Sequence, residues 1–343
     1  MIAAYLGDRI RLSVVLVLLS ACAVIADTDV GKWKPQSVPS PDGSVQEVAF
    51  PRERIGWICG FFAGVLRTTD RGSTWKELKS NLTTERIGSI SFLDSNRGWA
   101  AATSYAGKRP QQVILSTTDG GVSWTERKRV EGGIVHLVSI WFFDERLGWA
   151  VGARDDKPLV VSTSDGGATW REAYLGHDGR TWKDALIKGE LTNEIRRVRF
   201  ADALHGWAIG PGAIFYTSDG GSTWIPQYVS GDGVWLNGIA VLNSDKVWAV
   251  GGRGFLLRTN DHGVNWTRVS LPNKGDDFLW AIAFADPKSG WIGGNGVILS
   301  TRDGGDTWER QVSPVQGVLT DIAVTSSRVF VTGGTSRVLV LRR

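Results

Sequence analysis

One eight-residue string, Thr-x-Asp-x-Gly-x-Thr-Trp, recurs with small variations along this chain of 343 residues. Its six copies run from Thr68 to Trp75, Thr117 to Trp124, Thr163 to Trp170, Thr217 to Trp224, Thr259 to Trp266 and Thr301 to Trp308. The tryptophans of successive copies lie 49, 46, 54, 42 and 42 residues apart. Such a period indicates a fold built from copies of one supersecondary unit.

A second signature, Gly-Trp followed by small or apolar residues, precedes most copies of the first. It occurs at Gly56-Trp57, Gly98-Trp99, Gly148-Trp149, Gly206-Trp207 and Gly290-Trp291, with Val247-Trp248 as a variant. The last full unit predicts four short strands, at Leu279 to Ala285, Trp291 to Gly294, Gly296 to Thr301 and Thr307 to Gln311. Four strands in about 42 residues are typical of a β-propeller blade. The 43 Gly and 17 Trp agree with short strands joined by tight turns.

The two ends of the chain decide the number of blades. After the sixth copy, three more strands are predicted, at Leu319 to Val324, Val329 to Thr332 and Arg337 to Leu341. We call the turn formed by each copy of the repeated string the Asp turn. The segment around Trp33 resembles the strand that follows such a turn, and we expect it to complete the blade formed by these last three strands. We therefore predict an all-β, seven-bladed propeller over residues 31–343. Its antiparallel blades have four strands, and N- and C-terminal strands share the last blade, which leaves no exposed sheet edge.

The first residues have the pattern of an export signal. Arg9 and Arg11 precede an apolar run, Leu12 to Leu19, that is broken only by Ser13. A basic start, a short apolar stretch and small residues before a cleavage point are typical of a secretory signal peptide. The four residues Leu19 to Cys22 also resemble a bacterial lipobox, in which the Cys becomes the lipidated first residue.

We therefore expect a signal peptide at residues 1–21, lipidation of Cys22 and a linker at residues 22–30. The alternative is cleavage after Ala26, which would leave a soluble exported protein. Cys59 is then the one other cysteine, so a disulfide framework is not expected.

The Asp of each repeated turn is expected to be structural. Its short side chain can accept hydrogen bonds from nearby backbone N–H groups, and the Gly two positions later permits positive φ. The Trp is expected to pack between blades. These positions are Asp70, Asp119, Asp165, Asp219, Asp261 and Asp303, with Trp75, Trp124, Trp170, Trp224, Trp266 and Trp308. The alternative, a calcium or catalytic site, is disfavoured because equivalent turns on a ring lie far apart.

The repeated string resembles the Asp box, or bacterial neuraminidase repeat. The strand Gly148 to Gly152 and the turns Ser164 to Trp170 and Ser218 to Trp224 look most like the photosystem II stability/assembly factor family, over roughly residues 31–343. That resemblance implies a non-catalytic scaffold that binds a membrane-protein assembly intermediate, and the N-terminal signal adds the expectation of export and of membrane contact through the lipid anchor. No metal or cofactor is expected, and a net charge of only +4, evenly spread, does not indicate nucleic acid.

A secreted carbohydrate-active propeller is the alternative function. A sialidase needs a Tyr nucleophile and an Arg triad, but the Arg-Ile-Pro signature is missing, and few tyrosines follow the signal. These are Tyr105, Tyr174, Tyr216 and Tyr228. Other glycosidases use paired carboxylates about 5–10 Å apart, which one sequence leaves open. A carboxylate pair in the central pocket would favour the hydrolase, and an Arg-rich, acid-poor face would favour the scaffold.

Insertions into the repeat predict the binding face. They lie at Thr103 to Gln112, Ala153 to Pro158 and Leu175 to Glu194, in connections that leave the face opposite the Asp turns. The candidates there are Lys108, Arg109, Arg154, Lys157, His177, Arg180, Trp182 and Lys183, followed on an innermost strand by Arg196, Arg197 and Arg199. We predict a surface for an acidic partner. The alternative is solvated charge and channel-lining pairs with Asp or Glu.

Overall fold

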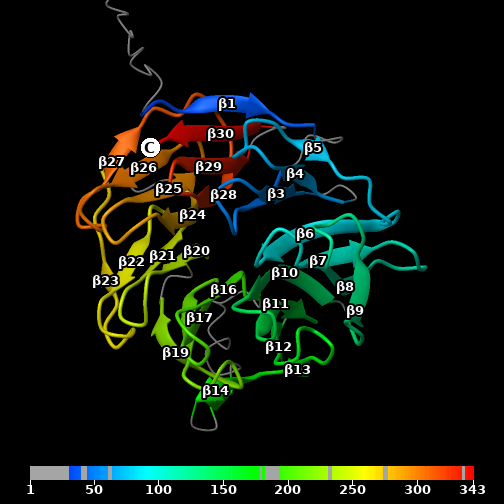
Figure 1. Cartoon of the computed structure of the whole chain (residues 1–343). Coiled ribbons are helices and arrows are strands. Elements are labelled where there is room, and N and C mark those ends of the chain that lie inside the picture. The colour runs from blue at the N-terminus through cyan, green and yellow to red at the C-terminus, as the bar shows by residue number, and fades with distance from the viewer. Residues whose placement is uncertain are drawn as a thin grey trace, which may run out of the picture.

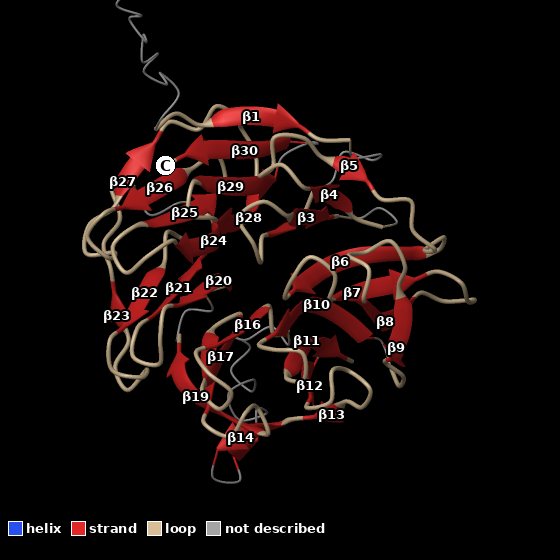
Figure 2. Ribbon diagram, viewed as in Figure 1, coloured by secondary structure: helices blue, strands red, loops and turns tan. Residues whose placement is uncertain are grey.

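Seven β-sheets are arranged as blades around a central channel (Figure 1). This computed structural model describes residues 31–39, 45–60, 64–133, 135–155, 157–177, 180–181, 194–230, 234–272, 277–333 and 337–343. Within these ranges the regular structure is all strand (Figure 2). The expected signal peptide, linker and Cys22 lie outside them. The seven-bladed all-β propeller is thus confirmed.

Each blade has four antiparallel strands numbered outward from the channel. The innermost strands of blades one to seven are, in this order, β2 (Glu47–Ala49), β6 (Glu85–Phe92), β10 (Val135–Phe142), β16 (Arg197–Phe200), β20 (Leu236–Val241), β24 (Leu279–Phe284) and β28 (Leu319–Val324). The second strands are β3 (Gly56–Cys59), β7 (Gly98–Ser104), β11 (Gly148–Arg154), β17 (Gly206–Gly210), β21 (Val247–Gly251), β25 (Gly290–Gly294) and β29 (Arg328–Gly333). The third strands are β4 (Leu66–Thr68), β8 (Gln111–Thr117), β12 (Lys157–Thr163), β18 (Ala213–Thr217), β22 (Leu256–Thr259), β26 (Ile298–Thr301) and β30 (Arg337–Arg342). The outer strands are β5 (Lys76–Glu77), β9 (Thr125–Arg129), β13 (Arg171–Glu172), β19 (Thr223–Val229), β23 (Thr267–Arg268), β27 (Glu309–Gln311) and β1 (Lys34–Ser37).

The ring closes where the beginning of the domain meets its end. Strand β1 pairs antiparallel with β30, from Lys34 opposite Val340 to Ser37 opposite Arg337. Trp33 is 8% exposed and belongs to the hydrophobic cluster of the last blade. The predicted sharing of the last blade by the two terminal strands is confirmed, and we call the β1–β30 pairing and the residues around it the seam.

The hydrophobic core lies between neighbouring blades. Trp57 of blade one stacks on Phe92 of blade two, with ring centroids 3.9 Å apart and planes at 4°. Its indole N–H donates to the carbonyl of Gly120, in the Asp turn of blade two, at 2.8 Å. Trp99 and Trp149 likewise donate to the carbonyls of Gly166 and Gly220, in the Asp turns of the next blades. The same stack recurs for Trp99 on Phe142 and for Trp149 on Phe200, whereas Trp248 packs on Phe284 with the ring planes tilted by 37°.

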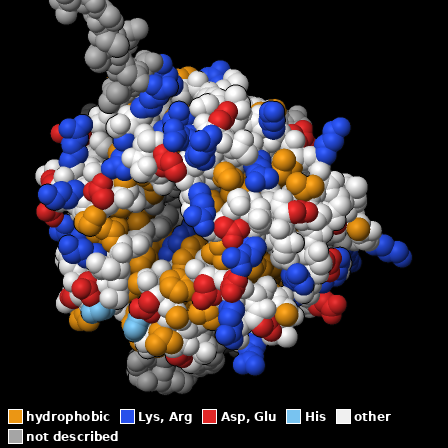
Figure 3. Space-filling view, in the orientation of Figure 1, with side chains coloured by type: hydrophobic (Ala, Val, Ile, Leu, Met, Phe, Trp, Pro, Cys, Tyr) orange, Lys and Arg blue, Asp and Glu red, His pale blue; other side chains and the backbone are white. Residues whose placement is uncertain are grey.

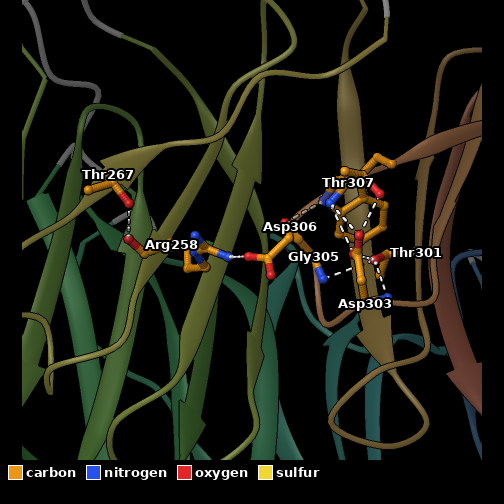
Figure 4. Close-up of polar contacts among 8 residues, drawn as sticks. Arg258, Thr267, Thr301, Asp303, Gly305, Asp306 and Thr307 are labelled. Carbon is orange, nitrogen blue, oxygen red and sulfur yellow. Dashed lines mark hydrogen bonds and ion pairs between the residues drawn. The ribbon is translucent and has the colours of Figure 1, made fainter.

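The Asp turns connect the third and fourth strands and are held by hydrogen bonds within themselves (Figure 4). Asp303 accepts from the backbone N–H of Thr307 at 3.0 Å and from its hydroxyl at 2.5 Å. The hydroxyl of Thr301 donates to Asp303 and accepts from Gly305 N–H, at 2.7 and 2.9 Å. The other five turns repeat these bonds at Asp70, Asp119, Asp165, Asp219 and Asp261. The closing tryptophans Trp75, Trp124, Trp224 and Trp308 are buried, and Trp170 and Trp266 are partly buried.

Two insertions differ from their expected form. Ala153 to Pro158 lengthens β11 and β12, because their pairing continues to Arg154 opposite Lys157. The start of the segment Leu175 to Glu194 adds two strands to blade four, β14 (Tyr174–His177) and β15 (Arg180–Thr181). β14 pairs in parallel with the outer strand β19, so this part of the insertion lies at the blade's edge.

Candidate partner-binding site

Two arginines from blade four project toward the channel. Arg197 and Arg199 are two residues apart on β16, so their side chains lie on the same face of the strand. Val198 between them is fully buried and packs in the core shared with blade three. The alternation of the strand therefore directs both guanidinium groups away from the core.

Both arginines line a cavity of about 660 Å³ in the centre of the ring. One side of this central cavity is apolar and comes from β20 and β24, including Ile239, Ile282 and Phe284. Trp141 and Trp280 add aromatic surface. Figure 3 shows the hollow, with basic and hydrophobic side chains inside it.

The central cavity opens on the face that carries the Asp turns. Leu242 and Lys246 line it from the β20–β21 connection, and Asp286 and Pro287 line it from the β24–β25 connection. First-to-second and third-to-fourth connections leave the same face of a four-stranded antiparallel blade. The cavity mouth is thus on the face opposite the predicted insertions.

Arg199 is held by the backbone of its own strand. Arg199 donates from Nη1 to the carbonyl of Val198 at 2.8 Å, and burial lowers its pKa. Within the described ranges, neither Arg197 nor Arg199 has a carboxylate oxygen within the 4.0 Å of an ion pair. The charges of both arginines nevertheless act on Asp321, so the alternative of solvated charge and channel-lining pairs with Asp or Glu is not contradicted.

Two buried carboxylates face the arginines from the neighbouring blades one and seven. Asp321 of β28 accepts from Val48 N–H, and Glu47 of β2 accepts from Ile90 N–H, each at 3.0 Å. Each bond reaches the innermost strand of the next blade, so both carboxylates hold the ring together. Burial, followed by the negative charge of Glu47, raises the pKa of Asp321 to about 7. Asp321 lines the cavity, whereas Glu47 is 5% exposed.

Arg196 precedes β16 and belongs to a different environment. Its guanidinium lies 4.8 Å from the ring centroid of Trp235 and donates to Asn237 at 3.1 Å. A carboxylate oxygen of Glu194 lies 3.6 Å from the Arg196 guanidinium, and the other lies 2.8 Å from Nδ1 of His136. The hydrogen bond and charge of Glu194 raise the pKa of His136. The guanidinium of Arg196 is thus held by Trp235, Asn237 and Glu194.

The other predicted residues are spread over several blades. Lys108 and Arg109 are exposed on the β7–β8 loop of blade two, and blade three separates them from β16. Arg154 forms an ion pair with Glu172, and Lys157 is exposed. His177 and Arg180 fall on β14 and β15, and Trp182 and Lys183 lie outside the described residues. The structure brings together Arg197 and Arg199 but not this wider set.

Sequence reasoning missed three residues of the central cavity, Trp141, Lys246 and Asp321. Trp141 and Asp321 occupy the same repeat positions as Arg199 and Arg197, one and three residues before the innermost strand ends. A comparison of the seven innermost strands would have found both.

The comparison with protein families agrees with this architecture. The sequence profile described as "Photosynthesis system II assembly factor YCF48" matches residues 25–131 and 177–332. The chain belongs to this family. A curated relative, "Photosystem II stability/assembly factor HCF136, chloroplastic" of Arabidopsis thaliana, is 24% identical over 281 residues. The match covers 75% of this chain and 64% of the relative, so the chain spans just under two thirds of that protein's length.

Solved structures of YCF48 proteins share the fold. "YCF48 bound to D1 peptide" has a TM-score of 0.70 at 20% identity and covers 92% of this chain and 96% of its own. YCF48 from Cyanidioschyzon merolae has a TM-score of 0.69 at 22% identity, covering 90% and 98%. A GH74 xyloglucanase from Xanthomonas campestris reaches 0.67 at 16% identity, covering 89% and 53%. At these identities the likeness shows the propeller fold alone.

The described ranges contain no group of three or more His, Cys, Asp or Glu residues that could hold a metal ion. They also contain no helix long and apolar enough to cross a membrane.

Proposed function

We propose that this protein is a non-catalytic binding scaffold that holds a segment of a membrane-protein partner during assembly. The family supports this proposal, because its members are described as assembly factors and one is described as bound to D1 peptide. The observation that carries it is the pair Arg197 and Arg199, placed in a central cavity without a carboxylate at ion-pair distance among the described residues.

The charges of the central cavity favour an acidic ligand. Arg197, Arg199 and Lys246 line it, against Asp286 and Asp321. Asp286 forms an ion pair with Arg343 at 2.8 Å, and a pKa of about 7 leaves Asp321 only partly ionised at neutral pH. An acidic side chain of the partner would therefore meet an excess of positive charge.

The apolar side of the cavity would bind the residues next to that acidic group. The wall formed by β20 and β24, together with Trp141 and Trp280, offers apolar contacts beside the two guanidinium groups. Burying apolar surface gives affinity, and the charged groups give orientation and specificity. The preferred ligand is thus an extended segment with one acidic residue among apolar ones.

Export and lipidation complete the proposal. The apolar run Leu12 to Leu19 and the lipobox-like residues ending at Cys22 would place the propeller outside the cytoplasm, tethered to a bacterial membrane. A tether would keep the scaffold near a partner that is itself inserting into that membrane. This would raise the effective concentration of the scaffold at the partner.

A glycoside hydrolase has weaker support. A glycosidase needs two carboxylates on either side of the scissile bond. Asp321 lines the central cavity, but Glu47 is buried and bonded to the backbone of blade two, and Asp286 is paired with Arg343. The cavity therefore does not offer two accessible, unengaged carboxylates among the described residues.

The test is capture of partners from detergent-solubilised membranes. The double variant Arg197→Glu and Arg199→Glu is compared with the native chain and with Lys76→Glu and Lys79→Glu, which make the same charge change at exposed positions of blade one. We expect the cavity variant to lose the captured membrane protein and the control to keep it. Arg197→Gln with Arg199→Gln avoids a buried negative charge, and its melting temperature checks folding. Capture unchanged in folded cavity variants would overturn the proposal.

A further inference from the structure

Two carboxylates line the central cavity, and Asp321 is the one without a cation at ion-pair distance among the described residues. The other, Asp286, is paired with Arg343 at 2.8 Å. The oxygen Oδ2 of Asp321 accepts from Val48 N–H at 3.0 Å, whereas Oδ1 accepts no hydrogen bond from a described residue. The carboxyl group of Asp321 is thus fixed through one oxygen, and the other oxygen can bind a ligand in the cavity.

Charged groups from blades one and four surround the carboxyl group of Asp321. Burial and the negative charge of Glu47 favour its protonated form, and the charges of Arg197 and Arg199 favour its ionised form. The first two effects are larger, so the pKa of Asp321 is raised to about 7. Asp321 therefore gains or loses its charge within the physiological pH range.

The other strands packed against β28 leave Asp321 as the group that titrates in the cavity wall. Strands β24 and β25 contain no titratable residue. On β29 the titratable residue is Arg328, four residues from Thr332, which is hydrogen-bonded to the backbone of Asp321. On β3, burial and the charges of Glu47 and Asp321 raise the pKa of the Cys59 thiol well above its ordinary value. The thiol therefore stays neutral when Asp321 titrates.

The charge of Asp321 decides how much positive charge an acidic ligand meets in the central cavity. When Asp321 is ionised, it offsets part of the charge of Arg197, Arg199 and Lys246, which line the same space. When it is protonated, it offsets none, and its O–H becomes a donor for a ligand carboxylate. A negatively charged ligand therefore prefers the protonated form. By linkage, binding of that ligand raises the pKa of Asp321 and draws a proton from solution.

We propose that Asp321 takes up a proton when an acidic residue of the partner enters the central cavity, so that the scaffold binds its partner more tightly as the pH falls. This inference rests on the proposed function, because it assigns regulation to the same cavity. The scaffold holds its partner under mildly acidic conditions and releases it as the pH rises.

Fluorescence anisotropy of a labelled peptide tests this proton linkage. The probe is a peptide with one Glu between Leu and Ala residues, and the control peptide has Gln in place of Glu. The native chain is compared with Asp321→Asn, which cannot ionise but keeps an oxygen that accepts from Val48 N–H. The melting temperature of the variant checks its folding.

The matched control is Asp286→Asn, which removes the other carboxylate of the cavity wall. Desolvation of Asp286 is outweighed by hydrogen bonds from Lys288 and Ser289, which lower its pKa, so Asp286 stays ionised at neutral pH. The readout for this variant is the ratio of its affinities at two pH values, and not the affinity itself.

We expect the native chain to bind the Glu peptide about tenfold more tightly at about pH 6 than at about pH 8, the change in the protonated fraction of a group whose pKa is about 7. Asp286→Asn should keep this ratio. Asp321→Asn should bind at the higher pH as tightly as the native chain does at the lower pH. The Gln peptide should show no such dependence on pH.

Calorimetry of the native chain measures the proton without any substitution. Titrations at about pH 7 in two buffers of different ionisation enthalpy should show uptake of roughly half a proton for each Glu peptide bound. Binding without proton uptake, or a pH dependence that Asp321→Asn retains, would overturn this inference and leave the proposed function standing. A native chain that binds neither peptide at the lower pH would overturn both.

Discussion

The glycine that begins most second strands is required by a phenylalanine six residues earlier. A Cβ atom on Gly148 would lie 2.4 Å from the ring of Phe142, and one on Gly98 would lie 2.5 Å from Phe92. The ring of Phe142 cannot move away freely because it stacks on Trp99 of the preceding blade, at 3.7 Å between centroids. The lack of a side chain at Gly148 therefore leaves room for the ring of Phe142 in its stack between blades two and three.

We expect Gly148→Ala to lower the free energy of unfolding by about 1–3 kcal/mol, the usual cost of overpacking a well-packed core. Gly107→Ala is the control, since a Cβ there would meet its nearest atom at 3.6 Å. Chemical denaturation measures both. In a Phe142→Val background, Gly148→Ala should cost less, which a double-mutant cycle measures. An effect of Gly148→Ala no larger than that of the control would contradict this account.

At the scale of single residues, the sequence predicted the arginines but not what faces them. Arg197 and Arg199 were found because three arginines in four residues are unusual on an innermost strand. Asp321 is far along the chain and faces them only because the ring closes. The phenylalanine partner of Gly148 was missed because the contact needs the pairing of Phe142 opposite Gly148 in two neighbouring strands.

At the scale of the element, the Asp turn places two successive residues in the left-handed region. Gly120 and Gly121 have φ of 74° and 93°, but Arg71 and His262 adopt φ of 62° and 61° at the first of these positions. Such conformations are costly for residues other than Gly. The turn persists because the Asp carboxylate accepts several bonds at once.

The carboxylate of Asp70 makes the stability of the first turn depend on pH. Hydrogen bonds from Thr74 and Thr68 outweigh its desolvation and lower its pKa to about 2 in the folded protein, against about 3.9 when unfolded. The stabilisation is present above about pH 4 and is lost as the pH falls toward 2. We expect Asp70→Asn to flatten the fall of unfolding free energy over this range. Glu77→Gln, an exposed carboxylate on β5, should keep the native slope, and the same flattening there would refute the assignment.

Strand positions were predictable because apolar residues alternate and turn residues bound them, but strand lengths were not. The segment from Ala153 to Pro158 contains two Asp and a Pro, which indicates a loop by sequence. The strands continue through it because Ala153 pairs with Pro158 and Arg154 with Lys157. Pairing across a hairpin depends on both strands at once, so the local sequence did not reveal it.

At the scale of the molecule, the position of the central cavity follows from side-chain size on the innermost strands. The inward positions of blades five and six carry Gly238, Ala240, Ala281 and Ala283, all of which line the cavity. Blade four carries Arg197 and Arg199 at the corresponding positions, so open space lies on one side of the channel and charge on the other. The insertions predicted a binding site on the opposite face. Loop length indicates how much chain is exposed on a face, but it does not indicate where small side chains leave space inside the ring.

Closure of the ring at the seam is the contact on which the whole arrangement depends. Trp33 is 8% exposed and packs in the cluster that contains Leu339 and Leu341. We expect Trp33→Ala to lower the free energy of unfolding by about 3–5 kcal/mol, the typical cost of truncating a buried Trp. Trp235→Ala removes the same side chain where it is 40% exposed and should cost clearly less. Thermal unfolding of the two variants distinguishes them. A Trp33 variant as stable as the Trp235 variant would mean that β1 does not hold the last blade, because a strand that closes a ring cannot lose its buried anchor without loosening the two blades it joins.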